Sequence, residues 1–441
     1  MKKYQSLYHL LPVFLLLAGC SKDKSTQPNN NNLNSVKIEI ISGNNQSDTI
    51  GKQLASPLVV KITKNGSPVS GVYVRFRGSG CNADNDFEIA SQADGTAKYL
   101  GFLSGDVGQQ TFKAYATDSN DKNIDSVSFN CTGLEPGAGW HLSGCNIPFG
   151  AIPEDFCTLS TGRLFTSYGA SIAYMRYSDD NARNWYPVVS AGKHSFQYIL
   201  SNSADELFAF SSDAGTLYSS DQGKTWASLG TTPFGAYTLT GASYGKDGKI
   251  LVSTQNHGLY ISSDKGKTWS QPTGVIKLAN STGPDGDFHT FIEDQSGNFY
   301  VAAGNSGTLY KSVDEGASWT AITPYQQEQV YSFYVDQHNW FYESRWDSNG
   351  GVYISKDNGA TYSILYNAPG HFVSNMSVQP DGNFYVSDST EGLYSGKGIG
   401  TPFRLVFYNA YPGLFVPYIV AKNNNLVVSD TGGGQIRYYQ H

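Results

Sequence analysis

The residues best suited to bind or transform a ligand lie in a few short segments of the second half of the chain. The most prominent is Arg345-Trp346-Asp347, where a guanidinium, an indole and a carboxylate are consecutive at a predicted strand-to-loop boundary. Together these groups can grip a polar ligand that has an apolar face. A second interpretation is that Trp346 packs between neighbouring sheets and Arg345 pairs with Asp347. Further ligand-binding candidates on predicted loops are His257, Asp287, His289, His371 and Tyr411.

The residue pattern favours binding over catalysis. Asp287 and Asp347 could supply the paired carboxylates of a glycoside hydrolase, but the sequence does not fix their separation. The sequence has no Ser/His/Asp set within a recognisable catalytic motif and no Gly-rich loop of the kind that binds phosphate. It also has no Cys and His residues at the spacing of metal ligands. Asp285-Gly286-Asp287 could belong to a calcium loop, although Asp-Gly is first of all a turn signal. We therefore assign no catalytic residue, metal or cofactor, and keep a hydrolase or lyase as the alternative function.

Composition restricts the class of partner. The formal net charge is −7 and no cluster of Lys and Arg occurs, which argues against nucleic acid, since its binding depends on neutralising phosphates. Only 15% of residues are charged, while 14% are aromatic and 48 are glycine, which is typical of soluble domains rich in β-structure.

The N-terminus has the features of an export signal. Lys2 and Lys3 precede an apolar run over 10–18 that is too short to span a bilayer as a mature helix. The run ends in Leu17-Ala18-Gly19-Cys20, which resembles the lipobox of bacterial lipoproteins. That resemblance implies a signal peptide over 1–19, a lipid on Cys20 and a location at the outer membrane or cell surface. Residues 20–34 are polar and predict a flexible linker between the anchor and the folded part.

An eight-residue repeat recurs between residues 178 and 362. Four good copies and one altered copy, in which Ala182 replaces a glycine, occupy 219–226, 262–269, 312–319, 355–362 and 178–185. The copies resemble the Asp box, S-x-D-x-G-x-T-W, of sialidase-like β-propellers, also called the BNR repeat. In such a turn the Asp accepts hydrogen bonds from turn amides, Gly takes a positive φ and the aromatic ring packs between sheets. We therefore interpret these Asp residues as structural rather than catalytic.

Each repeat follows two predicted strands, so that each unit reads as a four-stranded propeller blade. Six fourth-strand aromatics can be counted up to Phe403, and three more strands follow before the C-terminus. The missing fourth strand of that last unit matches residues 137–142, which resemble 316–321 of a complete unit. Pairing of the two ends would remove an exposed sheet edge. The sequence thus predicts a seven-bladed propeller over 135–441, with six blades as the second choice.

Residues 35–134 predict a separate β-sandwich. Short alternating strands, such as 36–40, 58–62, 72–76 and 110–115, recur between turn residues. The segments 57–72 and 94–97 resemble bacterial immunoglobulin-like domains of the invasin and intimin kind, which are usually spacers or adhesive units. The expected fold class is therefore all-β, with an immunoglobulin-like sandwich followed by a propeller.

Four cysteines remain after Cys20, an even number that suits two disulfides in an oxidising compartment. They are Cys81, Cys131, Cys145 and Cys157. Of the three possible pairings, 81–131 and 145–157 each lie within one predicted domain.

The propeller resemblance permits a test for sialidase activity. Sialidases need three arginines that converge on a carboxylate, and here only Arg345 approaches the propeller mouth opposite the boxes. Asn146 stands where the family's F/Y-R-I-P motif has its arginine. We therefore expect a membrane-anchored lipoprotein that binds a glycan or a protein through its propeller face without catalysis. A glycoside hydrolase or lyase of the Asp-box type is the alternative.

Overall fold

The computed structural model describes residues 35–78, 87–118, 122–137, 139–143, 153–168, 174–211, 213–235, 237–245, 248–255, 257–274, 288–303, 308–322, 329–346, 350–371, 373–379, 382–388, 392–397, 401–408, 418–420, 426–430 and 435–440. Among these residues the regular structure is β-strand, except for one 3-10 turn at Val189–Ala191. None of the described segments forms a helix with the length and apolar character that a membrane span requires.

The N-terminal domain is a sandwich of two sheets. One sheet contains β1 (Val36–Ser42), β3 (Leu58–Lys64), β4 (Ser67–Pro68) and β7 (Thr96–Tyr99). The other contains β2 (Gln46–Thr49), β9 (Asn123–Leu134), β8 (Gly108–Thr117), β5 (Tyr73–Arg77) and β6 (Phe87–Ala90). Apolar side chains from both sheets, including Ile62, Phe76 and Phe129, form one core. β1, β3 and β8 cover three of the predicted segments, and β5 covers the fourth except for Val72. The immunoglobulin-like assignment stays a prediction.

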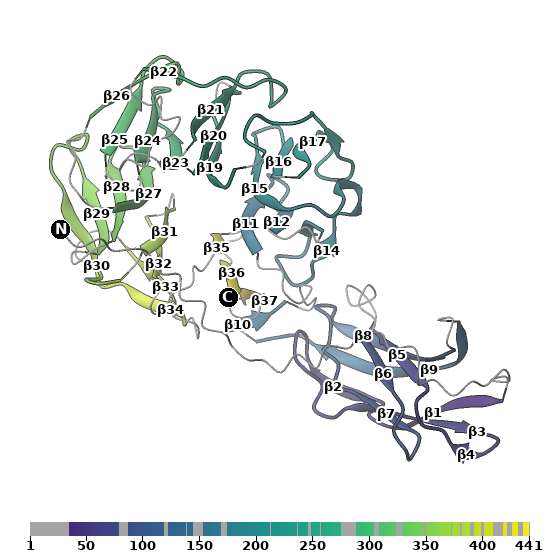
Figure 1. The fold of residues 1–441 in the computed structure, drawn as a ribbon. Coiled ribbons are helices and arrows are strands. Elements are labelled where there is room, and N and C mark those ends of the chain that lie inside the picture. Colours follow the sequence, from purple (N-terminus) through teal and green to yellow (C-terminus); the bar gives the residue numbers. More distant parts are fainter. Residues whose placement is uncertain are drawn as a thin grey trace, which may run out of the picture.

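Seven further sheets succeed one another along the described part of the chain and stand in a ring (Figure 1). We number them in chain order. Sheet 1 contains β11 (Pro153–Thr158), β12 (Leu164–Tyr168), β13 (Arg176–Ser178) and β14 (Tyr186–Pro187). Sheet 2 contains β15 (Phe196–Ser201), β16 (Leu207–Ser211), β17 (Gly215–Ser219) and β18 (Ala227–Ser228). Sheet 3 contains β19 (Leu239–Tyr244), β20 (Ile250–Thr254) and β21 (Gly258–Ser262).

Sheets 4 to 6 continue the same order. Sheet 4 contains β23 (Phe288–Glu293), β24 (Phe299–Ala303), β25 (Thr308–Ser312) and β26 (Ser318–Ala321), with β22 (Thr273–Gly274) added at the edge. Sheet 5 contains β27 (Gln329–Val335), β28 (Phe341–Trp346), β29 (Gly351–Ser355) and β30 (Ser363–Asn367). Sheet 6 contains β31 (Val373–Val378), β32 (Phe384–Asp388), β33 (Gly392–Gly396) and β34 (Arg404–Tyr408).

Sheet 7 joins the two ends of the ring. It contains β35 (Tyr418–Val420), β36 (Leu426–Asp430) and β37 (Gln435–Gln440), and its fourth strand is β10 (Gly139–Leu142). β10 runs antiparallel to β37, with Trp140 opposite Tyr439. The predicted pairing of these distant segments is therefore present.

The antiparallel order gives the ring two distinct faces. The turns between first and second strands, and those between third and fourth strands, lie on one side, which we call the box face. The loops between second and third strands, and the connections from one sheet to the next, lie on the other side, which we call the mouth face. Since loops carry most binding residues, both faces are candidate sites.

The repeated eight-residue turns have the hydrogen bonds that their sequence predicts. In 219–226, Asp221 accepts a bond from the Thr225 N–H at 2.9 Å and one from the Thr225 hydroxyl at 2.6 Å. These two bonds, the hydroxyl's first, hold the pKa of Asp221 at about 2. Gly223 has a φ of +81°, and a Cβ there would lie 2.4 Å from the ring of Phe165. The same carboxylate bonds recur at Asp264, Asp314 and Asp357.

The altered repeat in sheet 1 also contacts the N-terminal domain. Asn184 replaces the usual Thr, and its Nδ2 keeps one box bond by donating to Asp180 at 2.8 Å. The same amide accepts a bond from the Gly105 N–H at 2.8 Å and donates to Asp106 at 3.1 Å. Asn184 therefore connects the altered repeat 178–185 of sheet 1 to the sandwich through hydrogen bonds.

Candidate functional site

Half-buried rings line the mouth face of sheets 2 and 3, and each has a partner on an adjacent loop. The rings of Tyr237 and His257 stack with centroids 3.6 Å apart and planes 12° apart. Nδ1 of His257 also lies 2.8 Å from the carbonyl oxygen of Gln255. In sheet 2, Nδ1 of His194 lies 3.3 Å from Oδ2 of Asp213. In both sheets the connection entering the sheet contacts the loop between its second and third strands.

A third histidine on this face is held by a buried carboxylate. Nδ1 of His371 and the hydroxyl of Tyr366 both lie 2.9 Å from Oδ2 of Asp388. The Asp388 side chain is fully buried, whereas that of His371 is about one-third exposed. The contact through Nδ1 orients the imidazole ring and directs Nε2 of His371 away from Asp388.

Arg345 does not occupy the ligand-facing position that the sequence suggested. Only 6% of it is exposed, and its Nη2 donates to Oε2 of Glu343 at 2.8 Å. The guanidinium also lies 4.2 Å from the ring centroid of Tyr353 and 4.8 Å from that of Tyr362. The physical reason is strand alternation: Arg345 and Glu343 are two residues apart on β28 and therefore share one face of the sheet. Glu343 is therefore a partner of Arg345, while Asp347, the partner suggested by the sequence, lies outside the described residues.

The other predicted residues are only partly visible. Asp287, Asp347 and Tyr411 lie outside the described residues, and His289 and Trp346 are placed only as backbone on β23 and β28. His257 and His371 lie on the mouth face as expected. The structure joins them to Tyr237, Asp388 and Tyr366, which the sequence reading missed. One signal for this site was available in the sequence. Sheet 6 has the acidic Asp388 at the end of its second strand, where sheets 2 to 4 have Ser211, Thr254 and Ala303.

The box face contains a cavity between sheets 5 and 6. Its volume is about 640 Å³, within the range typical of small-molecule pockets. Tyr334, Tyr342 and Phe384 contribute rings to its lining, and the turn 336–340 contributes Gln337, His338 and Trp340. Asp336 in this turn accepts bonds from the N–H groups of His338 and Trp340, at 2.8 and 2.9 Å. Its carboxylate is therefore a structural part of the turn.

The predicted disulfides are not present at the two described cysteines. Cys131 and Cys157 are free and buried, and their expected partners, Cys81 and Cys145, lie outside the described residues. Burial raises the pKa of the Cys157 thiol to about 12. Over the described part of the chain, no three His, Cys, Asp or Glu side chains gather in a way that could hold a metal ion.

Comparison with known proteins agrees with this architecture. Residues 158–361 match the family model described as the DUF6242 beta propeller domain. Residues 139–440 contain a β-propeller. Each of its sheets is one blade. No curated protein matches the sequence.

Solved structures show the same fold at low sequence identity. YCF48 from Cyanidioschyzon merolae is 14% identical, with a TM-score of 0.53 over 69% of this chain and 99% of its own. YCF48 bound to D1 peptide is 12% identical, with a TM-score of 0.52 over 70% and 98%. Virginiamycin B lyase from Staphylococcus aureus with quinupristin is 9% identical, with a TM-score of 0.53 over 68% and 99%. At these identities the likeness concerns the fold alone.

Proposed function

We propose that the chain is an exported lipoprotein, anchored at the outer membrane or cell surface through Cys20, whose propeller binds a glycan or protein ligand without catalysis. Because the repeated turns resemble the Asp box, we also propose that the propeller belongs to the sialidase-like superfamily. The sandwich would act as a spacer between the membrane and the propeller.

One observation carries the binding proposal: the mouth face presents rings that are already held in place. Tyr237 and His257 fix one another by stacking, and His371 is fixed by Asp388. Ligand binding to ordered side chains avoids the entropy loss of ordering them, so such rings favour affinity. In support, one of the fold neighbours, YCF48, has been solved bound to D1 peptide.

Replacement of Tyr237 by Ala should weaken ligand binding at the mouth about tenfold or more, because the variant removes one ring and releases His257. A glycan array probed with the purified chain, together with a broad glycosidase screen, measures binding and turnover. Lys267→Ala is the control, since Lys267 is exposed on the box turn of the same sheet. Unchanged array binding by Tyr237→Ala, or rapid turnover by the parent, would refute non-catalytic binding at this site.

The hydrolase or lyase alternative has one specific observation in its favour. An imidazole oriented by a buried carboxylate, as in His371 with Asp388, is the arrangement of a general base. One of the fold neighbours is virginiamycin B lyase. If the glycosidase screen detects turnover, His371→Asn should abolish it while leaving the melting temperature close to that of the parent.

Lipid anchoring predicts that Cys20→Ser moves the protein from the membrane fraction to the soluble fraction. Stable anchoring needs more than one acyl chain, and these would all be lost with the thiol. Immunoblotting of separated membrane and soluble fractions measures the change. Ser21→Ala, one residue further on, should leave the protein with the membrane. Retention of the Cys20→Ser protein in the membrane fraction would contradict lipidation.

A further inference from the structure

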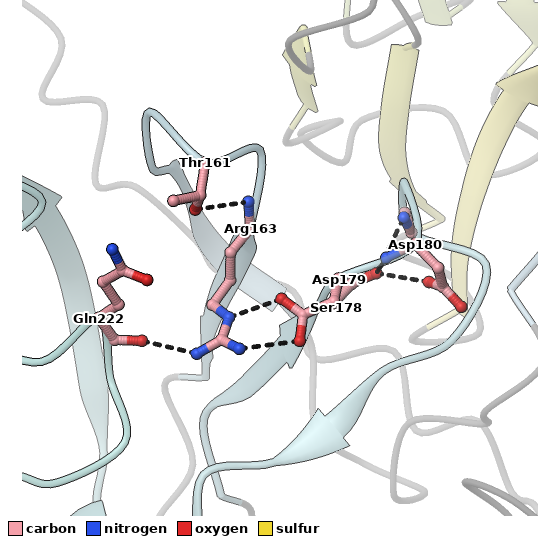
Figure 2. Close-up of polar contacts among 7 residues, drawn as sticks. Thr161, Arg163, Ser178, Asp179, Asp180 and Gln222 are labelled. Carbon is pink, nitrogen blue, oxygen red and sulfur yellow. Dashed lines mark hydrogen bonds and ion pairs between the residues drawn. The ribbon is translucent and has the colours of Figure 1, made fainter.

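Neighbouring blades contact one another in a regular way on the box face. The residue immediately before the second strand of one sheet reaches the fourth residue of the box in the next sheet. Figure 2 shows this for sheets 1 and 2: Arg163 donates to both carboxylate oxygens of Asp179, at 2.6 and 2.8 Å, and to the carbonyl oxygen of Gln222 at 2.9 Å. Arg163 thus links the two boxes.

The same contact recurs in the next two pairs of sheets. Glu206, before β16, accepts two bonds of 2.8 Å from Nζ of Lys265 in the box of sheet 3. Lys249, before β20, forms an ion pair with Glu315 in the box of sheet 4. In these pairs a box from the following sheet covers the first turn of the preceding one.

Between sheets 5 and 6 this arrangement changes. Trp340 stands immediately before β28, where sheets 1 to 3 have Arg163, Glu206 and Lys249 and sheet 4 has Asn298. The following sheet has no box, since Gly396 and Gly398 occupy the positions of Ser355 and Asp357 in sheet 5. The cavity of about 640 Å³ lies at this junction and is lined by both Trp340 and Lys397. The cavity therefore coincides with the loss of the box.

The lining of the cavity combines rings with polar groups, of which the amides are neutral and Lys397 is charged. Trp340 and Tyr334 are half-buried, whereas Gln337 and His338 are exposed. The Gln337 amide can both donate and accept, as can the Gln379 amide, which also lines the cavity. Asp336 is engaged by turn N–H groups and by the Tyr342 hydroxyl at 3.0 Å. Aromatic faces beside amide groups match a ligand that has both C–H faces and hydroxyl groups.

We propose that this cavity is a binding site for a neutral saccharide, separate from the mouth face. Nζ of Lys356 lies 4.1 Å from the ring centroid of Trp340, so Trp340 would stack on a sugar ring with its other face. Gln337, His338 and Gln379 would form hydrogen bonds with the hydroxyl groups of that sugar. The site lies on the opposite side of the ring from Tyr237 and His371, so it does not depend on the function proposed for the mouth. A chain with both sites could hold two ligands, or two parts of one long glycan, at once.

The test uses the purified full-length chain in detergent, titrated calorimetrically with neutral oligosaccharides of glucose, galactose, mannose and xylose. We expect at least one of these to bind. Trp340→Ala should weaken that binding about thirtyfold, as is typical for a central aromatic anchor. Gln337→Ala and His338→Ala should each weaken it severalfold. Because Trp340 also packs against the core between sheets 5 and 6, the two exposed residues keep the test valid if Trp340→Ala fails to fold.

Two controls separate this site from the mouth. Ser296→Ala changes the position equivalent to His338 one sheet earlier and should leave affinity unchanged. Tyr237→Ala should also leave it unchanged, so a loss with Tyr237→Ala alone would assign the sugar to the mouth and overturn the proposal. Absence of binding by every oligosaccharide tested, or equal affinity in Gln337→Ala, His338→Ala and the parent, would overturn it as well.

Discussion

Removal of residues 136–143 should sharply lower the melting temperature of the chain, although the deletion removes no loop of the mouth face. The deleted segment contains β10, which is the outer strand of sheet 7. Within it, Trp140 packs against the rings of Phe407 and Tyr439 at centroid distances of 5.1 and 5.4 Å. Its indole N–H also donates to the carbonyl oxygen of Val406 in sheet 6 at 2.5 Å. Truncation of one large packed aromatic typically costs about 3–5 kcal/mol, and the pairing of the strand is lost in addition.

The deletion should also promote aggregation, because β37 would become an exposed edge strand. Thermal denaturation followed by circular dichroism and light scattering measures both effects. Deletion of residues 22–29, a segment of equal length in the predicted linker, is the control and should melt like the parent. Trp140→Ala should fall between the two. A 136–143 deletion that melted like the parent would show that ring closure contributes little to stability.

The sequence was sufficient to predict the strands and the closure of the ring because both depend on repetition. The box turn is a local structure: Asp221 bonds to residues within four positions, so its pattern is visible in the sequence. The match of 137–142 to a fourth strand used the same repetition. The strand order within the sheets followed from copies of a single unit.

The functional residues were harder to predict because they depend on contacts between sheets. Arg345 was identified as a loop-boundary residue, but the identity of its partner depended on which face of β28 packs inward. Asp388 ends β32, and His371 lies 17 residues away from it in the sequence. The cavity was missed for another reason. It lies where the repeat is lost, at 396–398, and because the Asp residues of the repeat are interpreted as structural, the loss of one copy gives no functional signal in the sequence.

The ion pair between Glu343 and Arg345 should have a large effect on stability when it is broken from one side. The Glu343 side chain is 4% exposed and that of Arg345 is 7% exposed. The other oxygen of Glu343 accepts a bond from the Tyr362 hydroxyl. Removal of one partner from a buried pair leaves an uncompensated charge and typically costs about 3–5 kcal/mol. We therefore expect Glu343→Ala and Arg345→Ala each to lower the free energy of unfolding by about that amount.

Sheet 4 supplies a natural control for this prediction. Val301, Ala303 and Trp319 stand there in place of Glu343, Arg345 and Tyr362, while Tyr310 corresponds to Tyr353. Replacement of a whole buried pair by well-packed apolar residues is often neutral or stabilising. The triple variant Glu343→Val, Arg345→Ala, Tyr362→Trp should thus unfold within about 1 kcal/mol of the parent, well above either single variant.

The triple variant also decides whether Arg345 takes part in ligand binding. Because it removes the guanidinium without leaving a buried charge, loss of affinity in this variant would not be explained by unfolding. With Arg345 enclosed by Glu343, Tyr353 and Tyr362, we expect the triple variant to bind a mouth ligand like the parent while Tyr237→Ala does not. Chemical denaturation and array binding measured on the same preparations test both points. If the triple variant lost as much free energy of unfolding as the single changes summed, the structural role of the Glu343–Arg345 pair would be refuted. If it were stable but failed to bind the ligand, Arg345 would belong to the ligand site.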